Sequence, residues 1–505
     1  MIMIKKPNII LINTDQQRFD TIGALNAPFM ETPNIDKLVK EGVSFNNCFT
    51  TAPSCVPSRA SVFTGYYPHN TGVLCNGDTW EPSWVEMLAE EGYHCVNIGK
   101  MHTVPLDAQG GFHQRFIVEN KDRTLNLDTR ESAFYDEWDK YLAHEGVEKP
   151  SREKYKTFEG YENALGAFEW YLDSKYHPDN FVGNMACWWL ENRKSDSPLF
   201  LEIGFPGPHP PFDPVKEYIE PYMNKDLPLP EVTEEELKNQ PLHHHLYREE
   251  MIHSRAPHCK KRNNSDHDAL KWQKNPSPQQ LKRMRAHYYA NITMIDEKIG
   301  EIINVLENKG YLDDSIIIFT SDHGEALGDH GHVEKWTMYD CVVKVPLIVR
   351  CPEKFRGGRE INSLIQNMDI APTILELAGI DIPDSFDARS LMPLLNKEKE
   401  NIREYVFSEH GRDNCNYLVT GTDLITMIRS KKWKLVHYLD DEEKEYGELY
   451  DLTNDPEEKN NLWENKDYQD KKQKLLSIMS DWRAKSIYRA RPTIMKGKVE
   501  TGNLN

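Results

Sequence analysis

The sequence predicts an α/β protein with a large, mainly parallel sheet sandwiched by helices, and a smaller C-terminal antiparallel sheet plus helix. The near-continuous apolar run Asn8–Asn13 is typical of a strand buried on both faces. Further apolar runs then alternate with helical patterns, as strands and crossover helices do around a parallel sheet. From about Arg403, short strand patterns follow one another with no helical pattern between them, which indicates an antiparallel sheet.

Ordinary start and stop signals delimit the elements of the first part. Thr32-Pro33 opens a helical pattern that Gly42 ends. After it we expect strands at Val43–Phe49, His94–Ile98, Leu199–Phe205, Ser315–Thr320 and Val345–Val349, and helices at Ser58–Gly65, Ser83–Glu91, Gln279–Asn308 and Ala371–Leu377. This alternation predicts one α/β domain over residues 1–402, with insertions at about 113–195 and 220–278.

The last hundred residues have their own pattern. Strands are expected at Tyr405–Ser408, Leu424–Arg429, Trp433–Tyr438 and Glu448–Asp451, and a terminal helix near Tyr468–Lys485. We therefore expect an α+β subdomain over residues 403–505.

The two insertions contain segments with more than one interpretation. The first is rich in aromatic residues: Phe134, Tyr135, Trp138, Tyr141, Phe158, Tyr161, Trp170 and Tyr171. A local hydrophobic core is favoured over platforms on which sugars stack. In the second, His243-His244-His245 suggests a metal site. Because the stretch is polar and has no acidic partner at ligand spacing, we expect a solvated loop.

Bulk composition excludes some classes of partner. The chain has 505 residues and a formal net charge of -19, which argues against nucleic acid or an anionic membrane surface. No apolar run reaches the ~18 residues of a membrane span. The nine cysteines show no framework spacing, and the N-terminus shows no apolar leader. We therefore expect a cytoplasmic protein, or a periplasmic one if a leader was trimmed.

The most informative segment is Cys55-Val-Pro-Ser-Arg59, between a strand pattern and a helix pattern. Pro57 suits an early helical position, where a missing N–H costs little. Cys55 therefore lies at a helix N-terminus, where free N–H groups and the helix dipole favour negative charge. Two simple interpretations are a thiol of lowered pKa and a buried cysteine in an ordinary strand–turn–helix.

Acidic residues follow two of the expected strands. Asp15-Gln16 follows the first strand, and Asp322-His323 follows the strand Ser315–Thr320. The alternation of strands and helices brings both strand ends to one edge of the sheet, where ligands bind in open α/β folds. Two carboxylates, an amide oxygen and an imidazole at that edge predict a site for a divalent cation.

The string Cys55–Arg59, followed by Thr64-Gly65, resembles the signature of type I sulfatases, members of the alkaline-phosphatase-like superfamily. The resemblance covers most of the chain. It implies that a formylglycine-generating maturation enzyme oxidises Cys55 to formylglycine, an aldehyde whose hydrate is the nucleophile. Near the C-terminus, Glu448–Pro456 resembles the closing hairpin of the family, which is structural.

The resemblance also assigns the metal ligands. Asp15 and Asp322 match metal-binding aspartates. Gln16 stands where many members have a second Asp, and His323 where many have Asn. Both departures occur in relatives that include phosphonate monoester hydrolases. One divalent metal is implied, with Ca2+ favoured and Mn2+ more plausible than usual, because an imidazole is a softer ligand.

Other groups match family positions in order along the chain. Arg59 matches the arginine that orients the nucleophile, and the matching catalytic groups beyond it are Lys100, His102, His209 and Lys335. Asn76 is a candidate contact to the sulfate. His410, Arg412 and Asn414 are candidates for contact with the leaving group, although an ordinary polar loop is equally compatible.

The resulting hypothesis is a sulfatase that hydrolyses a small sulfate monoester, most simply that of a sugar. The nearest alternative is a phosphonate monoester or phosphodiester hydrolase on the same scaffold, which Gln16 and His323 favour. Lys100 and His102 favour the sulfatase, because phosphonate hydrolases that resemble this chain carry uncharged hydroxyl residues there. A non-catalytic binder of sulfated glycans is a third alternative, in which Cys55 stays unmodified. The sequence leaves the oligomeric state open.

Overall fold

The computed structural model describes residues 6–119, 135–195, 197–253, 272–411, 422–440 and 445–500. Within these ranges the main sheet has eight strands in the order β10–β2–β9–β7–β1–β6–β4–β5. They are β1 Asn8–Asp15, β2 Val43–Phe45, β4 His94–Gly99, β5 Gln114–Ile117, β6 Leu199–Pro208, β7 Ser315–Ser321, β9 Leu347–Arg350 and β10 Arg359–Ile361. Strand β9 runs antiparallel to both neighbours, and the other neighbouring pairs are parallel. The expected mainly parallel sheet is confirmed.

Helices cover both faces of this sheet, as expected for strands that are apolar throughout. One face is covered by α1 (Pro33–Glu41), α8 (Pro178–Asn192) and α12 (Pro278–Asn308). The other is covered by α2 (Cys55–Thr64), α4 (Trp84–Glu90) and α14 (Ile370–Leu377). Strand β1 shows the alternation directly, because Ile9 and Leu11 join the second cluster, whereas Ile10 and Ile12 join the first.

Two expected strands are each divided in the structure. Residues 43–49 form β2 in the main sheet and β3 (Cys48–Phe49) in a small sheet of order β11–β3–β8. Residues 344–350 likewise form β8 (Lys344–Val345) and β9, on either side of Pro346. Proline has no N–H to donate to a ladder, so the chain changes sheets there. The third strand of the small sheet is β11 (Ile365–Gln366).

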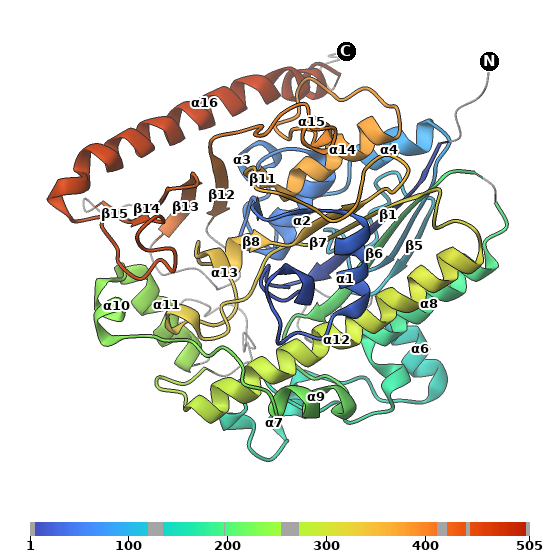
Figure 1. Cartoon of the computed structure of the whole chain (residues 1–505), viewed down its shortest axis with the longest axis horizontal. Coiled ribbons are helices and arrows are strands. Elements are labelled where there is room, and N and C mark those ends of the chain that lie inside the picture. Colours follow the sequence, from blue (N-terminus) through green and yellow to red (C-terminus); the bar gives the residue numbers. More distant parts are fainter. Residues whose placement is uncertain are drawn as a thin grey trace, which may run out of the picture.

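The C-terminal part forms a separate antiparallel sheet of order β12–β13–β14–β15, as expected. Its strands are β12 Val406–Gly411, β13 Thr422–Arg429, β14 Trp433–Asp440 and β15 Tyr446–Asp451. Helix α16 (Gln469–Glu500) lies along one side of it (Figure 1), where Leu475 and Met479 pack on the sheet. Side chains of β13 and β14 pack instead against the larger part. A domain boundary at residues 402 and 403 stays a prediction.

The remaining helices are short and lie around these layers. They are α3 Pro68–Thr71, α6 Glu137–Glu145, α7 Arg152–Lys156, α9 Lys216–Met223, α10 Glu234–Asn239, α11 Leu242–His253, α13 Asp340–Val343 and α15 Met392–Leu395. The segment 113–195, expected as an insertion, contributes β5 to the main sheet and α8 to one of its faces. Of its predicted aromatic residues, Trp138, Trp170 and Tyr141 join the main core, and Phe158 and Tyr161 pack in a small cluster with Tyr155 and Phe168. The hydrophobic-core interpretation is confirmed for them, and Phe134 lies outside the described residues. Tyr135 and Tyr171 are instead 66% and 37% exposed, so the prediction of a core is wrong for these two.

The prediction of a solvated loop at His243–His245 is wrong. These residues lie in α11, and His243 and His244 are each 2% exposed. The Nε2 atom of His244 lies 2.8 Å from the Tyr438 hydroxyl and 3.2 Å from Glu448 Oε1, both in the C-terminal sheet. A polar local sequence is buried here because a distant sheet supplies its hydrogen-bond partners.

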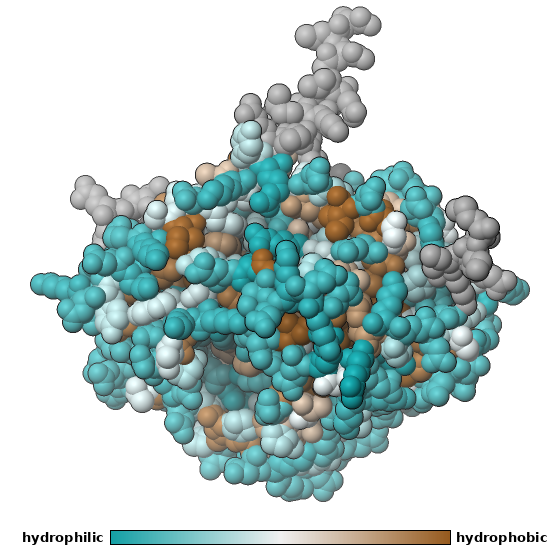
Figure 2. Space-filling model, turned by 45° about the horizontal axis from the view of Figure 1, so that its top comes forward, coloured by the Kyte–Doolittle hydropathy of each residue, from teal (hydrophilic) through white to brown (hydrophobic). Residues whose placement is uncertain are grey.

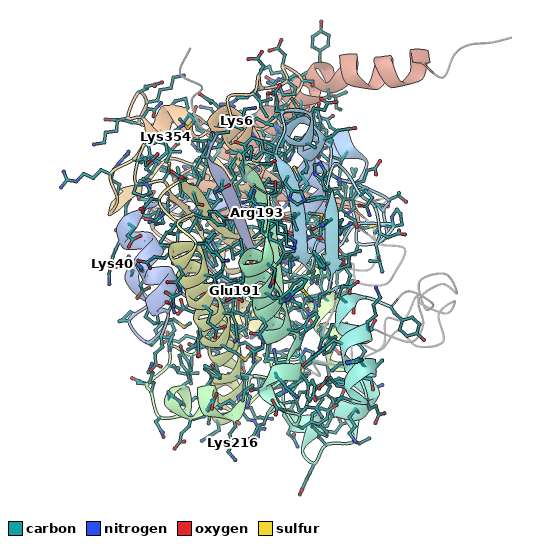
Figure 3. The ribbon with its side chains drawn as sticks, turned by 90° about the vertical axis from the view of Figure 1, so that its right-hand side faces the viewer. Lys6, Lys40, Glu191, Arg193, Lys216 and Lys354 are labelled. Atoms are coloured by element: carbon teal, nitrogen blue, oxygen red, sulfur yellow. The ribbon has the colours of Figure 1, made fainter. Side chains whose placement is uncertain are left out.

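The face of the molecule in Figure 2 is predominantly hydrophilic, with separate hydrophobic patches. Figure 3 shows Lys40 of α1 and Lys216 of α9 extending outward from helices whose apolar sides face the core. In the described part of the chain, no helix combines the length and apolarity that crossing a bilayer requires.

Candidate active site

The centre of the site lies where β1, β7 and α2 meet. Strands β1 and β7 are parallel neighbours with Thr14 opposite Ser321, so Asp15 and Asp322 emerge side by side at their carboxyl ends. Helix α2 begins at Cys55. The Cys55 Sγ atom lies 3.2 Å from His323 Nε2 and 3.8 Å from Asp15 Oδ1. Groups separated by about 300 residues in sequence therefore meet around one sulfur atom.

Four of these side chains have the geometry of a metal-binding cluster. One ligand atom from each of Asp15, Cys55, Asp322 and His323 lies within 4.8 Å of the others, and all four residues are buried. The Nδ1 atom of His323 is 2.9 Å from the Gly324 carbonyl oxygen. A carbonyl only accepts, so Nδ1 carries the proton and the lone pair of Nε2 faces the cluster, as in metal-ligating histidines. Two buried carboxylates and this imidazole fit a divalent cation.

Three cationic side chains reach the same centre. Lys335 Nζ donates to Cys55 Sγ at 2.9 Å, and Arg59 Nε donates to Asp322 Oδ2 at 2.9 Å. Lys100 pairs with Asp15. The three cationic side chains and the Asp15 carboxylate are all buried, so the Coulomb attraction between them is strong. The arrangement is able to bind a small anion beside Cys55.

Cys55 is not an activated thiol in this setting. Burial, and secondly the charge of Asp15, raise the pKa of Cys55 to about 11, although Lys335 and Lys100 oppose the shift. The interpretation as a thiol of lowered pKa is therefore wrong. The N-terminus of α2 does not outweigh burial, because Cys55 is only 1% exposed.

His102 and His209 lie on the loops after β4 and β6 and are half-buried, unlike the fully buried centre. Burial, with Lys100 as the next cause, holds the pKa of His102 well below its usual range. Burial and then Lys335 do the same for the pKa of His209. Both imidazoles are therefore neutral near pH 7, and each is able to accept a proton.

The residues predicted to contact the substrate have different positions in the structure. The Asn76 Oδ1 atom accepts hydrogen bonds from Ser54 Oγ at 2.7 Å and from the Val56 N–H at 3.1 Å, so it caps the start of α2. A further contact from Asn76 to a substrate stays a prediction. His410 is fully buried in β12, where burial lowers its pKa to about 4. Arg412 and Asn414 lie outside the described residues.

Two buried glutamates beside the cluster are absent from the sequence-based prediction. Glu325 is 0% exposed and Glu334 is 3% exposed, and both contact the side chain of Gln16. The available signal was the position of Glu325, three residues after Asp322 on the same loop. Single acidic residues in loops are common, so that position alone does not identify a site residue.

Comparison with known proteins agrees with this architecture. The sheet, its covering helices and the buried acid–imidazole cluster beside a cysteine define a hydrolase of the alkaline-phosphatase-like superfamily. The sulfatase family model matches residues 7–380, and the model described as N-sulphoglucosamine sulphohydrolase, C-terminal, matches residues 328–485. The chain belongs to the sulfatase family and is a sulfuric ester hydrolase.

Individual relatives cover nearly the whole chain. An arylsulfatase of Clostridium perfringens is 32% identical, over 94% of each chain. An N-acetylglucosamine-6-O-sulfatase of Bacteroides thetaiotaomicron is 26% identical, over 94% of this chain and 86% of its own. The crystal structure of a phosphonate monoester hydrolase of Agrobacterium radiobacter has a TM-score of 0.74 and 25% identity, over 95% of this chain and 96% of its own.

Proposed function

We propose that this sulfatase hydrolyses the sulfate monoester of a small sugar to an alcohol and inorganic sulfate. The carrying observation is the position of Cys55 at the first residue of α2, in contact with Lys335 and His323 and beside Asp15. The similarity to an N-acetylglucosamine-6-O-sulfatase supports a sugar as the alcohol. A cytoplasmic location, which would require an importable mono- or disaccharide, stays a prediction.

Two groups that this chain would acquire complete the proposal. A formylglycine made from Cys55 by a maturation enzyme would supply, as its hydrate, the attacking oxygen. A divalent cation, Ca2+ in the first place and Mn2+ in the second, would neutralise negative charge on the sulfate. The residues that would hold the cation are Asp15, Gln16, Asp322 and His323.

The chain's own cations and imidazoles would do the remaining work. Arg59, Lys100 and Lys335 orient the sulfate and neutralise its oxygens. The leaving alcohol needs a proton, for which Lys335 and His209 are the candidates. His209 is a neutral imidazole near pH 7, which favours Lys335 as the donor. Lys335 carries its proton near pH 7, because burial is outweighed by its anionic neighbours and its pKa is raised. Neutral His102 is suited to accept a proton in the later step that releases sulfate.

A phosphonate monoester hydrolase remains the second candidate function. The similarity to the Agrobacterium radiobacter structure supports it, as do Gln16 and His323 in the predicted ligand set. Lys100 favours the sulfatase, since its ammonium pairs with Asp15 inside the anion site.

Hydrolysis of 4-nitrophenyl sulfate and 4-nitrophenyl phenylphosphonate separates the two functions. The enzyme is produced together with a formylglycine-generating partner, and Cys55→Ala is the matched control. Faster sulfate cleavage that the control lacks supports the proposal, and release of sulfate from a panel of sulfated monosaccharides then identifies the alcohol. Faster phosphonate cleavage contradicts it in favour of the second candidate.

A further inference from the structure

Gln16 is held by ionisable side chains at both ends of its side-chain amide. Its Oε1 atom accepts a hydrogen bond from Lys335 Nζ at 3.0 Å. Its Nε2 atom donates to Glu325 Oε2 and, at 3.4 Å, to Glu334 Oε2. Gln16 and Glu325 are each 0% exposed, so water does not compete for these contacts.

Donor and acceptor chemistry fixes which end of the amide points where. An ammonium group has only donors, so the atom facing Lys335 is the amide oxygen. The other end of the same amide, which faces Glu325 Oε2, is therefore the nitrogen, a donor. Because Lys335 also donates to Cys55 Sγ at 2.9 Å, the amide oxygen is turned toward the cluster of candidate metal ligands.

Glu325 is itself anchored by the backbone. Its Oε1 atom accepts the N–H of Leu327 at 3.1 Å and the N–H of Glu334. Only Oε2 is therefore left to face Gln16. The main chain of Gln16 is held as well, since its N–H donates to Asp322 Oδ1 at 2.9 Å. Gln16 and Glu325 are therefore both held in place by other hydrogen bonds. In the contact between their side chains, Gln16 is the donor and Glu325 is the acceptor.

We propose that Glu325 is a positioning residue that turns the Gln16 amide oxygen toward the bound cation through its hydrogen bond to the Gln16 amide nitrogen. Burial and then the neighbouring Glu334 raise the pKa of Glu325 to about 7, so the hydrogen bonds of Glu325, and not a fixed negative charge, define its pairing with Gln16. This inference rests on the cation site of the proposed function. The chemical class of the ligand is a hard or intermediate divalent cation, Ca2+ or Mn2+.

The substitution Glu325→Gln tests the polarity of this contact. The new amide must present its oxygen to the N–H groups of Leu327 and Glu334, so its nitrogen faces the nitrogen of Gln16. Two donors then oppose each other, and the Gln16 amide turns its oxygen away from the cluster. We expect Ca2+ affinity to fall by roughly 10- to 100-fold, the usual effect of losing a group that orients a metal ligand.

The double variant Gln16→Glu with Glu325→Gln, which exchanges the two residues, is the second test. It keeps the number of atoms and the total charge, and it reverses the hydrogen bond so that the amide at position 325 donates to a carboxylate at position 16. We expect the exchange to bind Ca2+ more tightly than the two single changes predict when their effects are added. If Glu325→Gln fails to fold, the exchange is compared with Gln16→Glu alone, and we expect the exchange to bind Ca2+ more tightly than that single variant.

The measurement is isothermal titration of Ca2+, and separately of Mn2+, into the metal-free full-length protein and its variants. Asp296→Asn is the matched control: Asp296 is another buried carboxylate, at 1% exposure, which accepts N–H groups of α1 instead of Gln16. The control is expected to keep wild-type affinity. A folded Glu325→Gln with wild-type affinity, or additive effects in the exchange, overturns the proposal. A wild type that binds neither cation overturns the cation site itself, and the pairing with it.

Discussion

The pKa and the contacts of Cys55 are set by burial and by Asp15, Lys335 and Gln16. Its position at the start of α2 would lower the pKa of an exposed thiol, but here burial and Asp15 raise it to about 11. Lys335 lies 2.9 Å from the sulfur and is held there by Gln16. Near pH 7 the thiolate form of Cys55 is therefore scarce. This agrees with a chemistry in which Cys55 is first converted into another group.

At the residue scale we predict that Cys55→Ser gives at most one slow turnover per enzyme molecule. Serine offers one hydroxyl, so it has no second hydroxyl through which the aldehyde would re-form and sulfate would leave. Rapid-quench measurement of product per active site with an aryl sulfate checks this. Sustained turnover by the serine variant would contradict the proposed use of a modified residue.

At the element scale, α2 is capped from outside its own sequence. Ser54 gives no side-chain cap, and Asn76 supplies the acceptor from another loop. Asn76→Ala should lower the free energy of unfolding by about 1 kcal/mol, as the loss of an N-cap does. It should also lower kcat, because Cys55 is the first residue of the helix.

Asn76→Asp separates capping from substrate contact, because it retains the accepting oxygen. We expect Asp at this position to keep the melting temperature near that of the wild type. A raised KM with an unchanged melting temperature would support the predicted sulfate contact of Asn76. Equal destabilisation by Ala and Asp would contradict the capping role.

A second element-scale prediction concerns the contact between α11 and β15. Burial alone would raise the pKa of Glu448, but His244 and hydrogen bonds from His244, Tyr438 and Tyr450 lower it from 4.5 to about 2. A depressed pKa stabilises the fold above the pKa of the unfolded chain, and this contribution is lost as the pH falls toward the folded value. Glu448→Gln should cost about 1–3 kcal/mol near pH 7.

The pH dependence of the free energy of unfolding tests the contact between His244 and Glu448. In urea unfolding, the difference in stability between wild type and Glu448→Gln should shrink as the pH falls from about 5 to about 3. A difference that stays constant over this range would show that Glu448 contributes by packing and not by its charge.

The elements also show which parts of the fold local sequence determines. The buried strands β1, β6 and β7 and the long helix α12 were predictable because their apolar patterns are continuous or periodic. The division of 43–49 into β2 and β3 depends on which distant strand pairs with each half. The burial of His243 and His244 depends on β14 and β15, about 200 residues away.

The same distinction holds for the site. Asp15, Cys55 and Asp322 were predictable as candidates because each is set by a local strand end or helix start. Glu325 and Glu334 were not, since their relation to Gln16 exists only after the loop between them has folded back. The capping role of Asn76 is likewise a contact across 20 residues that no local pattern shows.

At the scale of the whole molecule, the site joins the ends of strands that are distant in sequence. The candidate ligands come from the ends of β1 and β7 and the start of α2, which folding alone assembles. A cation that binds only the folded state stabilises it by about 3 kcal/mol at a hundredfold excess over Kd. A chelator should therefore lower the melting temperature, and added Ca2+ should restore it.

Variants with an impaired ligand set provide the comparison for that experiment. Asp15→Asn should remove most of the response to chelator and Ca2+, whereas Asp296→Asn, in α12, should retain it. A wild type whose melting temperature ignores both reagents would contradict a structural contribution of the cation.

The measurement that tests the central claim most directly is the relation between sulfatase activity and aldehyde content at position 55. Preparations made with increasing amounts of the maturation enzyme are assayed for sulfate release, and mass spectrometry of the peptide that contains residue 55 gives the aldehyde fraction. We predict activity proportional to the aldehyde fraction, with a line through the origin. Full sulfate hydrolysis by protein that retains an unmodified Cys55 would contradict the account.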